Sequence, residues 1–220
     1  DFHKNLDYTL DNSINIHNKG TKKTYFGFST SEDAFTWLFI KYFIEQHKLK
    51  ELQGVFGLVD DIEEVLLWGV PQIHNETLSE KQKNLSTLCL DLGENLNSIT
   101  EPDIIIETKS DVVFIEVKLG SPNNNTKDKK KYEKYQIDDL YKDFDKAIES
   151  ERYQLVRNWT IGNLYANYYN KTFVLVNLVP ATLSRTDKSL ARFKTSLSTP
   201  DSFRVITWEG VLNKLSNENE

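Results

Sequence analysis

Cysteine is nearly absent from this sequence, since Cys89 is the single one among 220 residues, and the four histidines are scattered. One cysteine excludes an internal disulfide framework, and the chain shows no zinc-binding spacing of cysteine and histidine. A reducing cytoplasm is therefore the expected compartment. Long hydrophobic runs are missing too. The longest, residues 34–44, is interrupted by Lys41 and is too short to cross a bilayer, so no membrane partner is expected.

Positive charge is also scarce. Lysine and arginine number 27 against 33 acidic residues, which gives a formal net charge of −6. A nucleic-acid partner needs a basic face for its phosphates, so such a partner would have to use a local basic surface. Residues 127–134 hold five lysines and two acids. This segment could follow a nucleic-acid backbone, although a solvated helix start is the commoner explanation for such a run.

The hydrophobic content of 39% indicates a folded protein, and the length predicts a single domain over residues 1–220. Residues 1–23 show little periodicity and are expected to form a loose lead-in. Next, Ser29 with Glu32 and Thr30 with Asp33 both match the spacing of a capping box, which predicts the start of a helix. The residues that follow, up to Ile44, are apolar on nearly every side, as in a buried helix.

Residues 45–95 are interpreted as a possible helical elaboration, in which 55–68 and 79–91 could each form a helix. Two β-branched runs, 104–106 and 112–118, predict strands joined by a short polar loop over 108–111. Further on, the pattern predicts helices over 129–150, 151–168 and 186–196, strands over 172–179 and 203–208, and a short terminal helix. Strands alternating with helices indicate an α/β fold with a mixed β-sheet flanked by helices.

The hairpin brings three charged residues together. If 108–111 form the loop, Glu107 pairs with Val112, and Asp103 lies opposite Glu116 on the same face of the hairpin. Lys118 lies two residues beyond Glu116 and points to that face as well. Two neighbouring carboxylates repel each other unless a cation lies between them, and oxygen ligands favour Mg²⁺ or Mn²⁺. Such an ion and Lys118 would supply the parts for phosphodiester hydrolysis.

Residues 101–103 (Glu-Pro-Asp), followed after the hairpin by residues 114–118 (Phe-Ile-Glu-Val-Lys), resemble the signature of the PD-(D/E)XK nuclease superfamily. The resemblance spans roughly residues 29–44 and 94–180, and implies a restriction-endonuclease-like core. It also implies that Asp103 and Glu116 are metal ligands, that the carbonyl of Val117 is a further ligand, and that Lys118 is the catalytic lysine.

The superfamily suggests two more site residues. Its members usually place an acidic residue on a helix before the hairpin, close to the metal, and Glu32 is the first candidate here, with Asp33 second. Many also carry a glutamine on the helix that follows the lysine strand, and Gln154 occupies such a position. Glu32 could instead serve only to cap its helix, and Gln154 could be an ordinary helix residue.

The E-x-K triplet by itself is a weak signal. Residues 107–109 and 128–130 also satisfy the pattern, and the charges at Asp103, Glu116 and Lys118 could belong to a solvated hairpin face. Tyr165 and its neighbours 168 and 169 could stack on bases, but packing is the commoner use of tyrosines at that spacing. Cys89 is most simply a core residue.

These observations predict a metal-dependent endonuclease that hydrolyses DNA phosphodiester bonds at Asp103, Glu116 and Lys118, with RNA as another candidate substrate. The alternative is a catalytically inactive nuclease-fold module that binds nucleic acid or protein. A homodimer is a possible assembly for either function.

Overall fold

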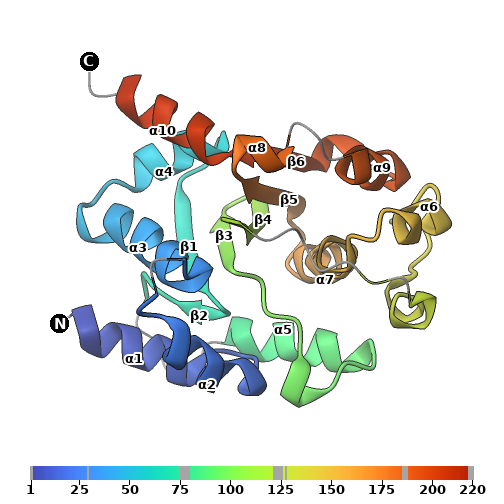
Figure 1. Ribbon diagram of the computed structural model, residues 1–220, viewed down its shortest axis with the longest axis horizontal. Coiled ribbons are helices and arrows are strands. Elements are labelled where there is room, and N and C mark those ends of the chain that lie inside the picture. The colour runs from blue at the N-terminus through green and yellow to red at the C-terminus, as the bar shows by residue number, and fades with distance from the viewer. Residues whose placement is uncertain are drawn as a thin grey trace.

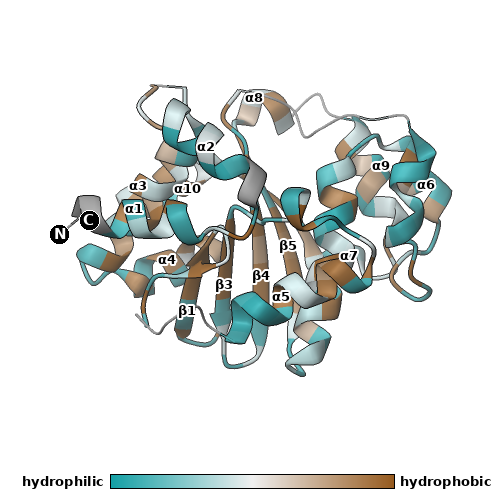
Figure 2. Ribbon diagram, turned by 90° about the horizontal axis from the view of Figure 1, so that it is seen from below, coloured by the Kyte–Doolittle hydropathy of each residue, from teal (hydrophilic) through white to brown (hydrophobic). Residues whose placement is uncertain are grey.

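A six-stranded mixed β-sheet forms the centre of the molecule, and helices cover both of its faces (Figures 1 and 2). The computed structural model describes residues 2–28, 30–74, 80–120, 126, 128–184 and 188–217. The strand order is β2-β1-β3-β4-β5-β6. The strands are β1 (Ile62–Leu67), β2 (Val70–Pro71), β3 (Ile104–Thr108), β4 (Asp111–Val117), β5 (Thr172–Val179) and β6 (Phe203–Thr207). The predicted α/β class with a mixed sheet is confirmed.

The sheet changes direction at β4. Strands β2, β1, β3 and β4 pair antiparallel in turn, whereas β5 pairs parallel to β4 and β6 parallel to β5. The long connection from β4 to β5 contains helix α7 (Tyr153–Tyr168), which packs against both strands. Because α7 covers one face at this point, the side chains that β4 presents there lie beneath the helix.

Two hydrophobic cores lie on opposite faces of the sheet. One contains residues of α7, α5 (Glu80–Asp91), α6 (Phe144–Glu149) and α9 (Lys188–Ser196). The other contains residues of α1 (Phe2–Asn12), α3 (Glu32–Glu45), α4 (Leu49–Phe56) and α10 (Trp208–Asn217). Val112 and Phe114 of β4 belong to the first core and Ile115 to the second, as the alternation of side chains along a strand requires. The described residues contain no helix long and apolar enough to cross a membrane.

The predicted register of the β3–β4 hairpin is confirmed. Glu107 pairs with Val112 and Ile104 with Ile115, and one further step along the same register brings Asp103 opposite Glu116. The helix predicted after residue 30 is present as α3, but its N-cap is Ser31, whose side chain accepts a hydrogen bond from the Ala34 N–H at 3.2 Å. Neither predicted capping box therefore provides the cap: Thr30 is not the N-cap, and Ser29 lies outside the described residues.

The expected loose lead-in is wrong, because residues 2–25 form two helices, α1 and α2 (Ile16–Tyr25). Leu10 is buried in the second core, and Ile14, between the helices, packs against Gly69. Asn15 caps α2 by accepting a hydrogen bond from the Asn18 N–H. The connection between the two helices is tied to the β1–β2 turn, because the Ile14 N–H donates a hydrogen bond to the Trp68 carbonyl at 3.2 Å. Both helices lie at the lower left of Figure 1.

The helical interpretation of residues 45–95 is only partly correct. Helices α4 and α5 are present, but the helix expected over 55–68 is replaced by the end of α4 and by strand β1. Glu64, which a helix would have placed in solvent, is buried in β1, where its carboxylate accepts hydrogen bonds from the N–H groups of Gln72 and Ile73. These bonds hold the chain after the β1–β2 hairpin.

The continuous helix expected over 129–150 is also absent. The segment forms two short 3₁₀ turns, η2 (Lys129–Lys131) and η3 (Glu133–Tyr135), followed by α6. Asp128 caps η2 and Asp143 caps α6, so these two acidic residues begin new elements. Asp139 has a positive φ of 70°, which is not helical. The remaining predicted helices and strands are present, with ends shifted by one or two residues.

Candidate active site

The open end of the β3–β4 hairpin brings two acids and a lysine together. Lys118 Nζ lies 2.8 Å from Glu116 Oε1, and these two side chains are almost fully buried. Asp103 Oδ2 accepts a hydrogen bond from the Val117 N–H at 2.8 Å, which holds the Asp103 carboxylate against the end of β4. The three residues that the motif singled out therefore share one site.

Burial and the neighbouring Glu116 carboxylate raise the pKa of Asp103 well above its usual range, while Lys118 and the Val117 N–H partly offset the shift. For Lys118, burial alone would lower the pKa, but Glu116, Asp103 and Glu32 together raise it above the ordinary lysine value. Lys118 is therefore a cation at neutral pH. It faces three acidic side chains, those of Glu116, Asp103 and Glu32, so acidic groups outnumber the lysine around it.

Helix α7 contributes an amide that the sequence analysis missed. Asn158 is fully buried, and its Nδ2 donates a hydrogen bond to Glu116 Oε2 at 2.8 Å. Gln154, the predicted glutamine, lies one turn earlier and lines the same cavity as Glu116, and so does Arg157. The missed signal is the spacing of three polar residues, 154, 157 and 158, at positions i, i+3 and i+4 of the helix.

The two acids at the start of α3 are placed differently. The Glu32 carboxylate accepts a hydrogen bond from the Leu119 N–H at 2.9 Å, and its Oε2 lies 3.5 Å from Lys118 Nζ. Asp33, the second candidate, lines the cavity together with Asp103 and Glu116, and burial raises its pKa. Glu32 thus holds the lysine and the chain that follows it, whereas Asp33 is the acid that faces the cavity.

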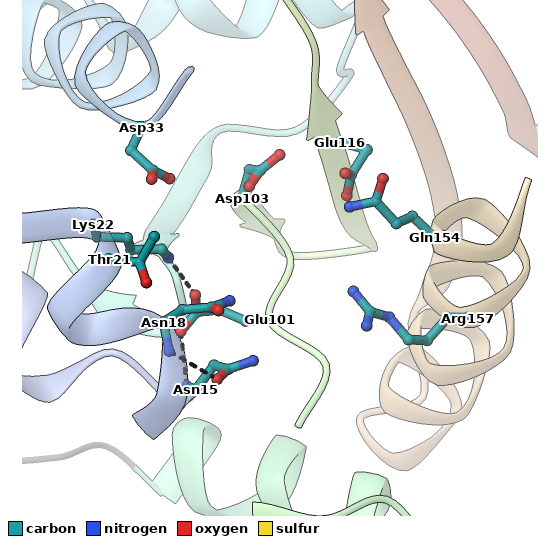
Figure 3. Close-up of a pocket in the computed structure, with 10 residues that line it drawn as sticks. All are labelled: Asn15, Asn18, Thr21, Lys22, Asp33, Glu101, Asp103, Glu116, Gln154 and Arg157. Atoms are coloured by element: carbon teal, nitrogen blue, oxygen red, sulfur yellow. Dashed lines mark hydrogen bonds and ion pairs between the residues drawn. The ribbon is translucent and has the colours of Figure 1, made fainter. Parts of the chain in front are cut away.

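A cavity of about 360 Å³ lies in front of the acids (Figure 3). Its lining comes from three directions: α2, the start of α3 with the hairpin, and α7. The lining residues are Asn15, Asn18, Thr21, Lys22, Asp33, Glu101, Asp103, Glu116, Gln154 and Arg157. The α2 wall was not predicted, because the N-terminal segment was expected to be loose. It is attached to the hairpin by an ion pair between Lys22 and Glu101.

The donors match a hard divalent cation in kind, but they are not arranged as a finished ligand set. Within the part of the chain that the structure describes, no group of three His, Cys, Asp or Glu side chains is placed to hold a metal ion. Both Glu116 oxygens have partners in Lys118 and Asn158. Mg²⁺ usually keeps several waters and uses one or two carboxylates, so Asp103 and Glu116 beside an open cavity fit this ion better than a three-ligand zinc site. The role of the Val117 carbonyl as a further ligand stays a prediction.

Comparisons with known proteins add no further assignment: no protein-family model, no curated protein and no solved structure matches this chain. Any function assigned to the site therefore depends on its geometry and on the motif.

Proposed function

We propose that this protein is a metal-dependent nuclease that hydrolyses phosphodiester bonds of DNA at the open end of the β3–β4 hairpin. The observation that carries the proposal is the meeting of Asp103, Glu116 and Lys118 beside an open polar cavity, with 2.8 Å between the lysine and Glu116. Two carboxylates that share a single lysine can attract a divalent cation. Proteins commonly use such cations to hydrolyse phosphate esters.

The order of elements supports a restriction-endonuclease-like core as part of this proposal. An acid-bearing helix, α3, precedes the hairpin, and a helix with a glutamine in its first turn, α7, leads from β4 to the parallel strand β5. Glu32 and Gln154 thus stand where the superfamily resemblance expects an acid and a glutamine, and each contacts or lines the site.

In the proposed reaction, Asp103 and Glu116 would hold Mg²⁺ or Mn²⁺, with Asp33 as a further acid facing the same cavity. The bound ion supplies positive charge for the phosphate and makes a water more acidic. Lys118, kept protonated by its acidic neighbours, donates to a phosphate oxygen and stabilises the charge that develops there. Glu32 positions Lys118, and Asn158 positions Glu116.

Cleavage assays with purified protein test the proposal. We expect plasmid or oligonucleotide DNA to be cut with Mg²⁺ or Mn²⁺ but not with EDTA, and Lys118→Ala to lower kcat by roughly 10²–10³-fold, as loss of one oxyanion donor does. The matched control is Lys109→Ala, because Lys109 belongs to the other E-x-K triplet of the hairpin and is exposed at its loop. Full activity of Lys118→Ala, or no cleavage of any DNA or RNA substrate, would remove the enzyme assignment.

A non-catalytic module is the second candidate. The net charge of −6 and the direct Lys118–Glu116 ion pair favour it, because this lysine already neutralises part of the acidic pair. Isothermal calorimetry with Mg²⁺ separates the two candidates. A Mg²⁺ site that is present in the wild-type protein and lost in Asp103→Ala supports the nuclease. If the wild-type protein gives only the heat of Mg²⁺ dilution, the result supports the non-catalytic module.

A further inference from the structure

Arg157 is a cation of the cavity that the proposed reaction does not use. It lies on α7, one turn after Gln154, and its guanidinium points into the cavity toward the acids (Figure 3). Its Nε is buried and has no hydrogen-bond partner among the described residues. The ring of Tyr153 lies 5.7 Å from the guanidinium carbon, so an aromatic face supports the group on one side.

The acids around Arg157 already have other partners. Burial lowers the pKa of Arg157, but Tyr135, Glu94 and Glu116 raise it, and the net shift is upward. Glu94 accepts hydrogen bonds from Thr100 and from the Tyr135 hydroxyl at 2.6 Å. Glu116 is bonded to Lys118 and to an amide of α7. The Arg157 side chain is therefore charged and half-buried, and no hydrogen bond or ion pair joins its guanidinium to either acid among the described residues.

Such a group favours an anionic ligand. A guanidinium offers five N–H donors in a planar fork that matches two oxygens of a phosphate, and an unpartnered buried donor costs free energy until it is bonded. Lys22, another cation of this cavity, is already paired with Glu101. Across the cavity, Asn18 and Thr21 of α2 present uncharged polar side chains. Arg157 is thus the lining cation with donors to spare.

We propose that Arg157 binds a phosphate group of the substrate strand, at or next to the phosphate that is cleaved, by a two-pronged hydrogen bond from its guanidinium. This inference rests on the proposed function, because it assumes that a nucleic-acid strand enters the cavity. Arg157 would hold the phosphate from the α7 side, while α2 forms the opposite side of the cavity (Figure 3).

Binding measured in EDTA tests Arg157 without requiring a metal or cleavage. A fluorescent single-stranded oligonucleotide is titrated with wild-type protein, Arg157→Gln and Arg157→Lys, and inorganic phosphate is added as a competitor. Arg192→Gln is the matched control, since Arg192 lies on α9 and donates to the Glu149 carbonyl at an exposed position. We expect Arg157→Gln to raise Kd about tenfold or more and to lower the salt slope by about one, with Arg157→Lys in between.

The two phosphate sources give different patterns. If the oligonucleotide and inorganic phosphate both bind wild-type protein and both weaken in Arg157→Gln, the subsite takes a free or terminal phosphate. If only the oligonucleotide weakens, it takes a phosphodiester. Either pattern supports the inference, whereas binding by Arg157→Gln equal to that of Arg192→Gln, or no binding of either probe by wild-type protein, overturns it.

The outcome is distinct from that of the nuclease assay. Wild-type protein that binds oligonucleotide through Arg157 but cleaves nothing would refute the nuclease and keep the phosphate subsite. Active wild-type protein whose Arg157→Gln variant keeps both its Kd and its KM would refute the subsite and keep the nuclease. Thermal unfolding of each variant distinguishes loss of stability from loss of phosphate binding. If Arg157 had only a structural role, its replacement would lower Tm and leave the salt dependence of Kd unchanged.

Discussion

The two ends of the β3–β4 hairpin use the same residue types in different proportions. At the loop end, the buried Glu107 has Lys81 Nζ at 2.6 Å, Lys171 Nζ at 3.7 Å and the Tyr165 hydroxyl at 2.8 Å. At the open end, Asp103 and Glu116 share one nearby lysine, Lys118. The buried acid at the loop end thus has two lysines beside it, whereas the two acids at the open end share one lysine.

Helix α7 covers both ends, which makes the comparison sharper. Its Tyr165 contacts Glu107 and its Asn158, two turns earlier, contacts Glu116, so both glutamates lie under the same helix face. Only the open end borders the 360 Å³ cavity. E-x-K triplets therefore lie at both ends of this hairpin, and the cavity distinguishes the open end from the loop end. We therefore expect the loop end to be structural and the open end to be the one that holds a ligand.

Removal of Glu107 should have the largest effect on stability. Glu107→Ala deletes the acid that holds two lysines and a tyrosine hydroxyl, and we expect a loss of about 3 kcal/mol in the free energy of unfolding. Urea unfolding measures it. Glu116→Ala at the open end should lower the free energy of unfolding of the metal-free protein by clearly less, because it also removes the repulsion between Glu116 and Asp103. Equal losses for the two variants would contradict the comparison.

Loss of Asn158 should act on the metal rather than on the whole fold. Asn158→Ala leaves Glu116 without the amide that orients it, and outer partners of this kind typically contribute 10–100-fold to metal affinity. Mn²⁺ binding followed by electron paramagnetic resonance measures the change. The loop-end counterpart, Tyr165→Phe, removes only a hydroxyl from Glu107 and should leave Mn²⁺ affinity at its wild-type value. An unchanged affinity in Asn158→Ala would show that Glu116 needs no support from α7.

Asp103→Asn should stabilise the protein in the absence of metal. The raised pKa of Asp103 means that folding favours its protonated form, so its contribution to stability is full below the ordinary aspartate pKa and is lost as pH rises through the folded value. Asparagine cannot ionise, so the variant does not lose this contribution. We expect its free energy of unfolding to be higher by on the order of 1 kcal/mol at pH 7 in EDTA. The gain should shrink when thermal unfolding is repeated near pH 4. A destabilised variant at pH 7 would contradict the proposed repulsion.

The hairpin and its acids were predictable because their geometry is local. A short polar loop between two β-branched runs sets the register, and the register alone places Asp103 opposite Glu116. The capping residue of α3 was missed by one position because Thr30 and Ser31 can both cap, and only the folded chain selects Ser31.

The α2 wall of the cavity could not be predicted from local pattern. Residues 16–25 are mostly polar, and tertiary contacts hold them in place, chiefly the Lys22–Glu101 ion pair and the Asn15 N–H bonded to Glu101. Strand β1 was mistaken for a helix because it is buried on both faces, so its sequence lacks the two-residue alternation of a half-exposed strand.

The most direct test of the central claim is a calorimetric titration of Mg²⁺ into wild-type protein and into Asp103→Asn and Lys109→Ala. An excess of acid at the open end predicts a saturable Mg²⁺ site in wild-type protein and in Lys109→Ala that disappears in Asp103→Asn. A wild-type protein that binds no Mg²⁺, or an Asp103→Asn variant that binds it as tightly as the wild type, would contradict this account.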